Sequence, residues 1–222
     1  CNQCAFVCPH ACLRPAINEV GANKPEGYAT KACTGLKGFE YRMQVSPLDC
    51  MGCGVCANVC PAKEKAITMV EFEQVAAKEE VNYEYSENLP EVDTSCFKKT
   101  TVKGSQFAKP LFEFSGACAG CGETPYIKVI TQLFGDRMII SNATGCSSIY
   151  GGSAPTCPYT VNKDGKGPAW ANSLFEDNAE HGYGYYLAYA QRRNKLAETV
   201  QRALDNGAKG KIKKALIEWM EN

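Results

Sequence analysis

The sequence lacks several features that would mark common functional classes. Only two of its 222 residues are histidine, and its 24 lysines and arginines equal its 24 aspartates and glutamates. A chain without net charge offers no electrostatic case for binding nucleic acid or an anionic membrane surface. No apolar run approaches the roughly 20 residues that span a bilayer. We therefore expect a cytoplasmic protein that binds neither nucleic acid nor membranes.

Cysteine, in contrast, is abundant, with 14 residues in the chain. The sequence shows no signal peptide and is too long to need disulfide bonds to hold it folded, so we do not expect a disulfide scaffold. Its 45% apolar and 22% charged residues are those of ordinary globular material, sufficient for one medium or two small domains. Many thiols with few histidines indicate a reducing compartment and iron–sulfur chemistry rather than imidazole ligation.

Four cysteines lie in the stretch CMGCGVCANVCP at residues 50–61, at spacings of two, two and three residues and followed by a proline. This is the spacing of a bacterial [4Fe–4S] run, in which three thiolates on one loop serve one cluster and the fourth serves another. Gly52 and Gly54 allow the backbone to fold close around the cluster. Zinc is the alternative, although zinc sites use two cysteine pairs on two knuckles.

Part of a second such run opens the chain, CNQCAFVCP at residues 1–9. It holds the last three cysteines of the motif, and the first would lie three residues before Cys1. We therefore expect the chain to be an internal piece of a longer polypeptide. Cross-ligation predicts one complete ligand set and one incomplete set: Cys50, Cys53, Cys56 and Cys8 form the first, and Cys1, Cys4 and Cys60 the second.

The surrounding residues predict an α+β, ferredoxin-like two-cluster domain over residues 1–74. Residues 13–48 are an insertion between the runs, and its alternating segment at 38–45 predicts a strand. The stretch AKEKAITMVEF after Pro61 predicts a closing strand. Residues 75–110 are polar without a sustained period, which predicts a linker. Because this linker exceeds the roughly 12–15 residues usual for a connection without secondary structure, we expect it to pack between two domains.

From residue 111 the pattern changes to that of an α/β domain. A glycine-rich turn holds Cys118 and Cys121, and a helix is predicted from Thr124, as its N-cap, to Gly135. A strand of type RMIISNA then leads into a second glycine-rich turn with Cys146. Turns at the same edge of a sheet lie close together, so these three cysteines predict an incomplete cluster site, with zinc or chance as alternatives.

The last third of the chain predicts a loop and two helices. Residues 153–172 are rich in Pro, Gly and Asn and predict a lid or an inter-domain contact. Residues 173–207 predict a long helix, in which Gly182 and Gly184 suggest a break or a close approach by another element. A final helical segment carries lysines that predict a solvated face.

The order of these motifs closely resembles the pyruvate:ferredoxin oxidoreductase (pyruvate synthase) family. The resemblance rests on a two-cluster module followed by FSGACAGCGETPY and by ISNATGCSSIYGGSAPTCPYTVNKDGKGPAWANSLFEDNAEHGYG. It covers nearly the whole chain, and phrases such as PAWANS and SLFEDNAE have no mechanistic reason to recur elsewhere. The resemblance implies that residues 111–222 open an α/β thiamine-diphosphate-binding domain, whose cluster is held at the positions of Cys118, Cys121 and Cys146.

The resemblance also implies a chemistry. In the family, thiamine diphosphate with Mg²⁺ supports the decarboxylation of pyruvate, coenzyme A takes the acetyl group, and electrons leave singly through three [4Fe–4S] clusters to ferredoxin or flavodoxin. It implies a homodimer at full length and a place in anaerobic metabolism. The residues expected to face the thiamine cofactor are Glu123, Thr144, Gly145, Ser147 and Ser148. No catalytic residue can be assigned.

Three parts of the family pattern are missing from the sequence: the opening cysteine of the first run, the fourth ligand of the third cluster, and the GDG…N motif for Mg²⁺ and diphosphate. We therefore expect the chain alone to be inactive. Cys12, four residues after Cys8, is a candidate for tuning a cluster. The alternatives are the same chemistry on another 2-oxoacid, an electron-transfer module without thiamine chemistry, and a structural zinc protein.

Overall fold

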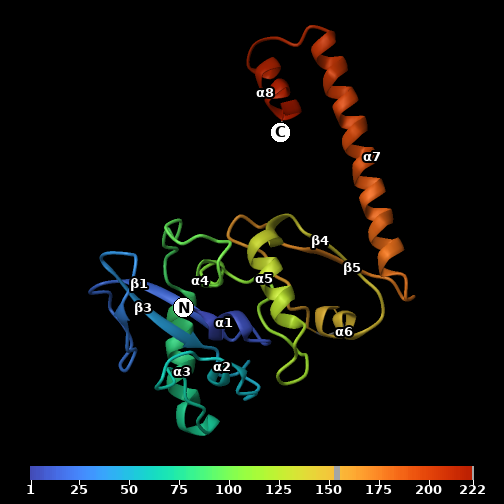
Figure 1. Cartoon of the computed structure of the whole chain (residues 1–222). Helices are drawn as coiled ribbons and strands as arrows, with labels where there is room; N and C mark the ends of the chain where they lie inside the picture. The colour runs from blue at the N-terminus through green and yellow to red at the C-terminus, as the bar shows by residue number, and fades with distance from the viewer. Residues whose placement is uncertain (153–155, 222) are drawn as a thin grey trace. The chain divides into compact units, whose positions relative to one another are not determined.

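The computed structural model describes residues 1–152 and 156–221. These residues form two compact units, unit 1 with residues 1–140 and 145–170 and unit 2 with residues 141–144 and 171–222 (Figure 1). The predicted domain boundaries at residues 74 and 110 stay a prediction. Within the described part of the chain, no helix is long and apolar enough to cross a membrane.

A three-stranded antiparallel sheet forms one side of unit 1, in the order β1-β3-β2. Strand β3 spans Phe39–Val45, which confirms the predicted strand, and pairs with β1, Leu13–Glu19, and with β2, Lys31–Ala32. The sequence pattern did not predict β1. Pro15 interrupts its alternation, and proline is tolerated there because β1 is an edge strand.

Two short helices, α1 at Gln3–Val7 and α2 at Val55–Asn58, carry cysteines of the two cluster runs and pack against each other. Each helix follows a residue with positive φ, Asn2 before α1 and Gly54 before α2. The predicted closing strand after Pro61 is wrong, because residues 61–71 form an irregular segment that finds no strand partner. Ile67 of this segment instead packs against the buried cluster of Ala5, Cys8, Cys12 and Leu13.

Helix α3, Phe72–Glu87, corrects the prediction of a linker without regular structure. The helix packs against β3 through polar side chains rather than through an apolar stripe. A helix is recognised in a sequence by apolar residues that recur at helical spacing. Helix α3 has no such apolar face, so the sequence pattern did not predict it. A second short helix, α4 at Val102–Ser105, is capped by Thr101, whose Oγ1 accepts a hydrogen bond of 3.1 Å from the Gly104 amide.

Helix α5, Thr124–Phe134, followed by the 3₁₀ turn η1 at Gly135–Arg137, confirms the predicted helix and its end. The predicted N-cap is wrong by one residue, since Glu123 occupies that position. Thr124 Oγ1 instead donates a 2.6 Å hydrogen bond to the carbonyl of Pro9. The side chain that looked like a local cap therefore joins α5 to the first cluster run.

Strand β4, Ile139–Asn142, confirms the predicted strand and pairs with β5, Ala169–Asn172. The second glycine-rich turn is shorter than predicted, because helix α6 already begins at Cys146 and runs to Gly152. The predicted loop at 153–172 is irregular over residues 156–168 and ends in β5. Its first three residues lie outside the described residues.

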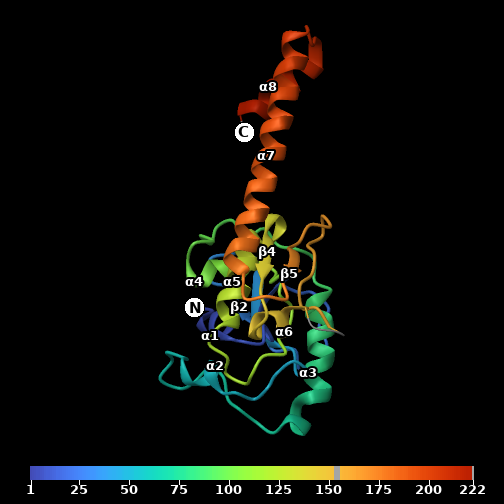
Figure 2. The same ribbon diagram turned by 90° about the vertical axis from the view of Figure 1, so that its right-hand side faces the viewer.

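Unit 2 consists mainly of α7, Asn178–Asp205, and α8, Gly210–Glu221. Figure 2 shows α7 as one unbroken helix, so the predicted break at its glycines is wrong. The close approach is confirmed at Gly182, where an added Cβ would lie 3.6 Å from the Cβ of Ser141. The final helix is also confirmed, with its lysines exposed to solvent.

Candidate metal centre

A cavity of about 210 Å³ in unit 1 is lined by cysteines from both cluster runs. Four of them are the predicted complete set, and the fifth is the predicted tuning residue: Cys8, Cys50, Cys53, Cys56 and Cys12. The remaining walls are largely apolar and include Leu13, Val45 and Ile67. The structure thus brings Cys8 to the loop at residues 50–56, although these segments are far apart in sequence.

The loop that carries three of these thiols depends on two glycines. Gly52 and Gly54 have φ values of 64° and 73°, a region that side chains with a Cβ enter only at a cost. This backbone turns the loop back on itself before α2 begins at Val55. Cys50, Cys53 and Cys56 can therefore line one wall of the same small cavity.

Cys12 lies beside predicted ligands and shifts the pKa of two of them. Its Sγ lies 3.4 Å from Cys8 Sγ in a buried contact. This contact lowers the pKa of Cys8 to about 5, and Cys12 likewise lowers the pKa of Cys50 to about 6. The pKa of Cys12 itself is raised, since its proton is shared with Cys50 and Cys8. Because the thiolate is the form that binds a metal, Cys12 favours the ligating form of two predicted ligands.

The thiols that line the cavity match the ligand number that a [4Fe–4S] cluster requires. In the described ranges, no three His, Cys, Asp or Glu side chains converge closely enough to hold one metal ion. A cuboidal [4Fe–4S] cluster instead takes one thiolate per iron, so its four ligands stand apart around a larger body. Four thiols on the walls of a shared cavity with apolar sides fit that requirement.

The second predicted set is Cys1, Cys4 and Cys60, and of these Cys4 packs against the buried cluster of Ala5, Cys8, Cys12 and Leu13. Burial raises the pKa of Cys4, and the charge of Cys60 adds to this rise, which places these two thiols within electrostatic reach of each other. Cys60 Sγ accepts a 3.4 Å hydrogen bond from the Ala66 amide, while Cys1 is exposed. Ligation by this set stays a prediction.

The third predicted set contains the turn of Cys118 and Cys121, closed by a 3.0 Å hydrogen bond from the Cys121 amide to the Cys118 carbonyl. At the tip of this turn, an added Cβ on Gly120 would lie 3.9 Å from the Cβ of Cys53. The turn therefore packs against the loop of the first set. Cys146 is exposed at the first position of α6, and its ligation together with the other two stays a prediction.

The residues predicted to face thiamine diphosphate are held mainly by local contacts. Glu123 occupies the N-cap position of α5 without a capping hydrogen bond from its side chain, and it lies near Tyr150, whose pKa is raised by burial and by the Glu123 carboxylate. Ser148 Oγ accepts a 2.8 Å hydrogen bond from the Gly145 amide and donates one of 2.6 Å to the Gly145 carbonyl. Ser147 is half-buried and Thr144 is exposed. Their contact with a cofactor stays a prediction.

Sequence reasoning missed Lys128, which lies on α5 and is only 2% exposed. Its Nζ donates hydrogen bonds to the carbonyls of Ala5 and, at 3.5 Å, of Cys8. Burial lowers the pKa of Lys128 to about 8. One signal was available, because Thr124, Lys128 and Thr131 follow helical spacing and together form a buried polar face.

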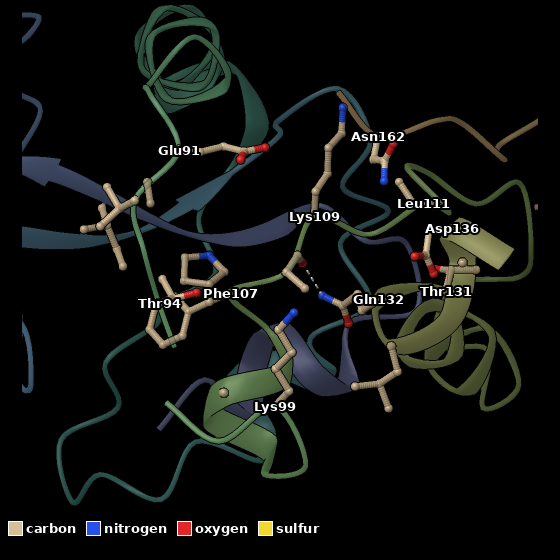
Figure 3. Close-up of a pocket in the computed structure, with 18 of the residues that line it drawn as sticks. Glu91, Thr94, Lys99, Phe107, Lys109, Leu111, Thr131, Gln132, Asp136 and Asn162 are labelled. Atoms are coloured by element: carbon tan, nitrogen blue, oxygen red, sulfur yellow. Dashed lines mark hydrogen bonds between the residues drawn. The ribbon is translucent and has the colours of Figure 1, made fainter. Parts of the chain in front are cut away.

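A larger cavity, of about 480 Å³, lies elsewhere in unit 1 and contains none of the predicted ligands (Figure 3). Several of its charged side chains are neutralised by ion pairs, such as Glu91 with Lys163 and Asp136 with Arg137. A cavity whose charges are paired in this way offers little to select a charged ligand. The cysteine-lined cavity is therefore the better candidate site.

Comparison with known proteins agrees with this assignment. Residues 1–63 match the family described as "4Fe-4S double cluster binding domain". Over 99% of its length the chain is 60% identical to pyruvate:ferredoxin oxidoreductase from Moorella thermoacetica, of which it covers 19%. Over its whole length it is 53% identical to pyruvate-flavodoxin oxidoreductase from Enterobacter agglomerans, again covering 19%.

A relative with another acceptor in its name matches as well. The chain is 50% identical, over 92% of its length, to the protein named "Pyruvate dehydrogenase [NADP(+)]" from Cryptosporidium parvum, of which it covers 11%. The chain thus spans a fifth or less of the length of these curated relatives. Over nearly its whole length, the chain is thus similar in sequence to one segment of pyruvate:ferredoxin and pyruvate-flavodoxin oxidoreductases.

Proposed function

We propose that this chain is the electron-transfer segment of a 2-oxoacid oxidoreductase. The complete enzyme would decarboxylate pyruvate oxidatively with coenzyme A, forming acetyl-CoA and CO₂, and would pass the electrons through three [4Fe–4S] clusters to ferredoxin or flavodoxin. The observation that carries the proposal is the cavity in which Cys8 of the first run meets the three thiols of the second. Crossed runs of this kind are characteristic of two-cluster electron carriers.

The chain's own residues would perform three tasks. A bound [4Fe–4S] cluster supplies one-electron transfer. Cys50, Cys53, Cys56 and Cys8 would hold it in an apolar cavity, and Cys12 would keep two of these ligands deprotonated. The turn at residues 118–121 packs against Cys53, so the third ligand set would stand beside the first. A path for single electrons requires such short separations between its sites.

The thiamine part of the proposal rests on the relatives and on position. Glu123, Gly145, Ser147, Ser148 and Thr144 would line the side of the thiamine diphosphate and Mg²⁺ site that this chain supplies. The sequence contains no match to the GDG…N motif expected for the metal and the diphosphate. We therefore propose that decarboxylation needs polypeptide beyond this segment, in a homodimeric enzyme.

Anaerobic reconstitution with iron and sulfide tests the proposal, followed by iron and sulfide analysis and electron paramagnetic resonance after reduction with dithionite. We expect one robust cluster, at the complete ligand set, and two labile ones. Cys53→Ala should abolish the robust signal, because each thiolate holds one iron. Cys96→Ala is the matched control, since Cys96 is an exposed cysteine outside all three sets. A colourless protein, or an unchanged signal in Cys53→Ala, would contradict the proposal.

The NADP⁺-named relative favours a second candidate for the terminal acceptor. Its sequence is 50% identical to this chain although its name gives a nicotinamide acceptor. The same segment is therefore compatible with different final acceptors. Reduction of ferredoxin, flavodoxin and NADP⁺ by the complete enzyme, compared at equal pyruvate turnover, would distinguish them.

A further inference from the structure

We propose that Lys128 is a positioning residue that raises the reduction potential of the cluster held by Cys8, Cys50, Cys53 and Cys56. The inference rests on the proposed function, because it requires a cluster in the cysteine-lined cavity. Lys128 is not a ligand in this proposal. Its role is to place a buried positive charge beside the backbone that carries Cys8.

The Lys128 ammonium lies next to the backbone of the first cluster run. Helix α5 packs against α1 (Figure 1), and Lys128 reaches across to the carbonyls of Ala5 and Cys8. Ala5 is fully buried and lies between the two ligands that α1 and its end provide, Cys4 and Cys8. The ammonium therefore lies within the protein, close to one ligand of the complete set.

No carboxylate in the described part of the chain forms an ion pair with Lys128. Burying an ammonium costs several kcal/mol unless hydrogen bonds and opposite charge compensate it. Two carbonyl oxygens supply part of the compensation. The remaining partner must be negative and must lie nearby. The Cys8 carbonyl that Lys128 bonds belongs to a predicted ligand of the complete set, so a cluster held there would lie nearby.

A cluster with four thiolate ligands supplies that negative charge. It carries one more negative charge after reduction than before, so a nearby cation stabilises the reduced state more than the oxidised state. In a buried site this interaction is only weakly screened. Removal of the charge should therefore make reduction harder and lower the potential.

The same helix offers a matched control. Thr124, one turn before Lys128, donates a 2.6 Å hydrogen bond to the Pro9 carbonyl, next to Cys8. Thr124→Val removes a bond between α5 and the cluster run but changes no charge. Lys128→Gln removes the charge and retains a donor, whereas Lys128→Arg retains the charge.

The test is a redox titration of the reconstituted chain, followed by electron paramagnetic resonance, with iron content measured for each variant. In Lys128→Gln we expect the ratio of reduced to oxidised cluster at a fixed potential to fall at least tenfold, which corresponds to about 59 mV for one electron. Lys128→Arg and Thr124→Val should each change this ratio by less than about threefold, or about 28 mV.

Two results would overturn the inference. One is a Lys128→Gln protein with full iron content and an unchanged potential. The other is a Lys128→Gln protein that loses its iron while Thr124→Val keeps it, because Lys128 would then be structural. Failure of the proposed function is recognised separately, since the unsubstituted chain would then form no cluster to titrate.

Discussion

Glu79 of α3 is the centre of a polar cluster that fastens this helix to the sheet. Its carboxylate accepts hydrogen bonds of 2.8 Å from Arg42 Nη2 and 2.9 Å from Gln44 Nε2, both on β3. Asn82 Nδ2 donates a third, at 3.3 Å. The Arg42 and Glu79 side chains are only 14% and 15% exposed. Buried hydrogen bonds to the charged carboxylate of Glu79 therefore hold α3 against the sheet, where an apolar contact would usually do so.

Substitution of Glu79 tests the strength of this cluster. Hydrogen bonds to charged groups contribute about 1.5–3 kcal/mol, so we expect Glu79→Gln to lower the free energy of unfolding by about that amount. Glu80→Gln is the matched control, because Glu80 is the exposed neighbour on the same helix, and it should change stability by less than about 0.5 kcal/mol. Denaturant unfolding of the two variants measures the difference, and equal stabilities would contradict the interpretation.

The pH dependence of the same pair follows from the charge of Glu79. Burial by itself would raise the pKa of this carboxyl, but the bonds from Gln44 and Arg42 outweigh it and hold the pKa below its ordinary value. The unfolded state then binds a proton more readily than the folded state. Stability from Glu79 is therefore complete above the unfolded pKa of about 4.3 and is lost as the pH falls through the folded pKa. The gap between the unsubstituted chain and Glu79→Gln should therefore close as the pH falls below the folded pKa.

Among the elements, α5 has an unusual orientation. Its buried face is formed by Thr124, Lys128 and Thr131, whereas Tyr126 is 69% exposed and Phe134 is 48% exposed. An apolar stripe usually faces the core of a protein. Here the polar face is buried because it supplies donors to the carbonyls of the first cluster run.

Helix α7 provides a prediction at the same scale. An added Cβ at Gly184 would meet no atom within 4 Å, and the residue is exposed within the helix. Gly184→Ala should stabilise α7 by about 0.5–1 kcal/mol, since alanine loses less conformational freedom. Amide exchange in α7 should then slow by about two- to fivefold.

The glycine at the C-terminal end of α7 gives the opposite expectation. Gly207 has a φ of 85° and its amide bonds to the Leu204 carbonyl at the helix end. An alanine there must adopt the left-handed conformation, at about 1–2 kcal/mol. Gly207→Ala should therefore speed exchange in the last turn of α7. Equal effects of the two substitutions would show that backbone conformation does not decide stability here.

At the scale of the whole molecule, predicted iron ligands form part of the core of unit 1. Cys8 is buried with Ala5, Cys12 and Leu13, and Cys56 packs against this group. When metal ligands belong to a core, the free energy of binding becomes free energy of folding. We therefore expect loss of the clusters to destabilise unit 1.

Hydrogen exchange before and after oxidative removal of iron measures this effect. Amides of α1 and β1 should exchange at least about tenfold faster without iron, which is about 1.4 kcal/mol. Amides of α7 serve as the internal control, because unit 2 contains none of the cysteines. Unchanged protection of α1 would show that the ligands are not coupled to the core.

The sequence by itself determined the features that depend on neighbouring residues. The spacing of thiols at residues 50–60 specifies a loop able to serve a cluster, and the patterns of β3, α5 and α7 specify their secondary structure. In each case the residues that carry the signal are close together in the chain. Local propensity and periodicity are therefore sufficient to predict these elements without knowledge of the tertiary structure.

The tertiary structure decided what depends on residues distant in sequence. It brought Cys8 to the cysteines of the second run, turned Thr124 from a cap into a contact with Pro9, and buried Lys128 beneath α1. It also formed α3 through hydrogen bonds to β3, without an apolar stripe. A polar side chain has the same appearance in a sequence whether water or a distant carbonyl satisfies it. Only the folded arrangement supplies that partner, and with it the burial and charge that give the side chain its role.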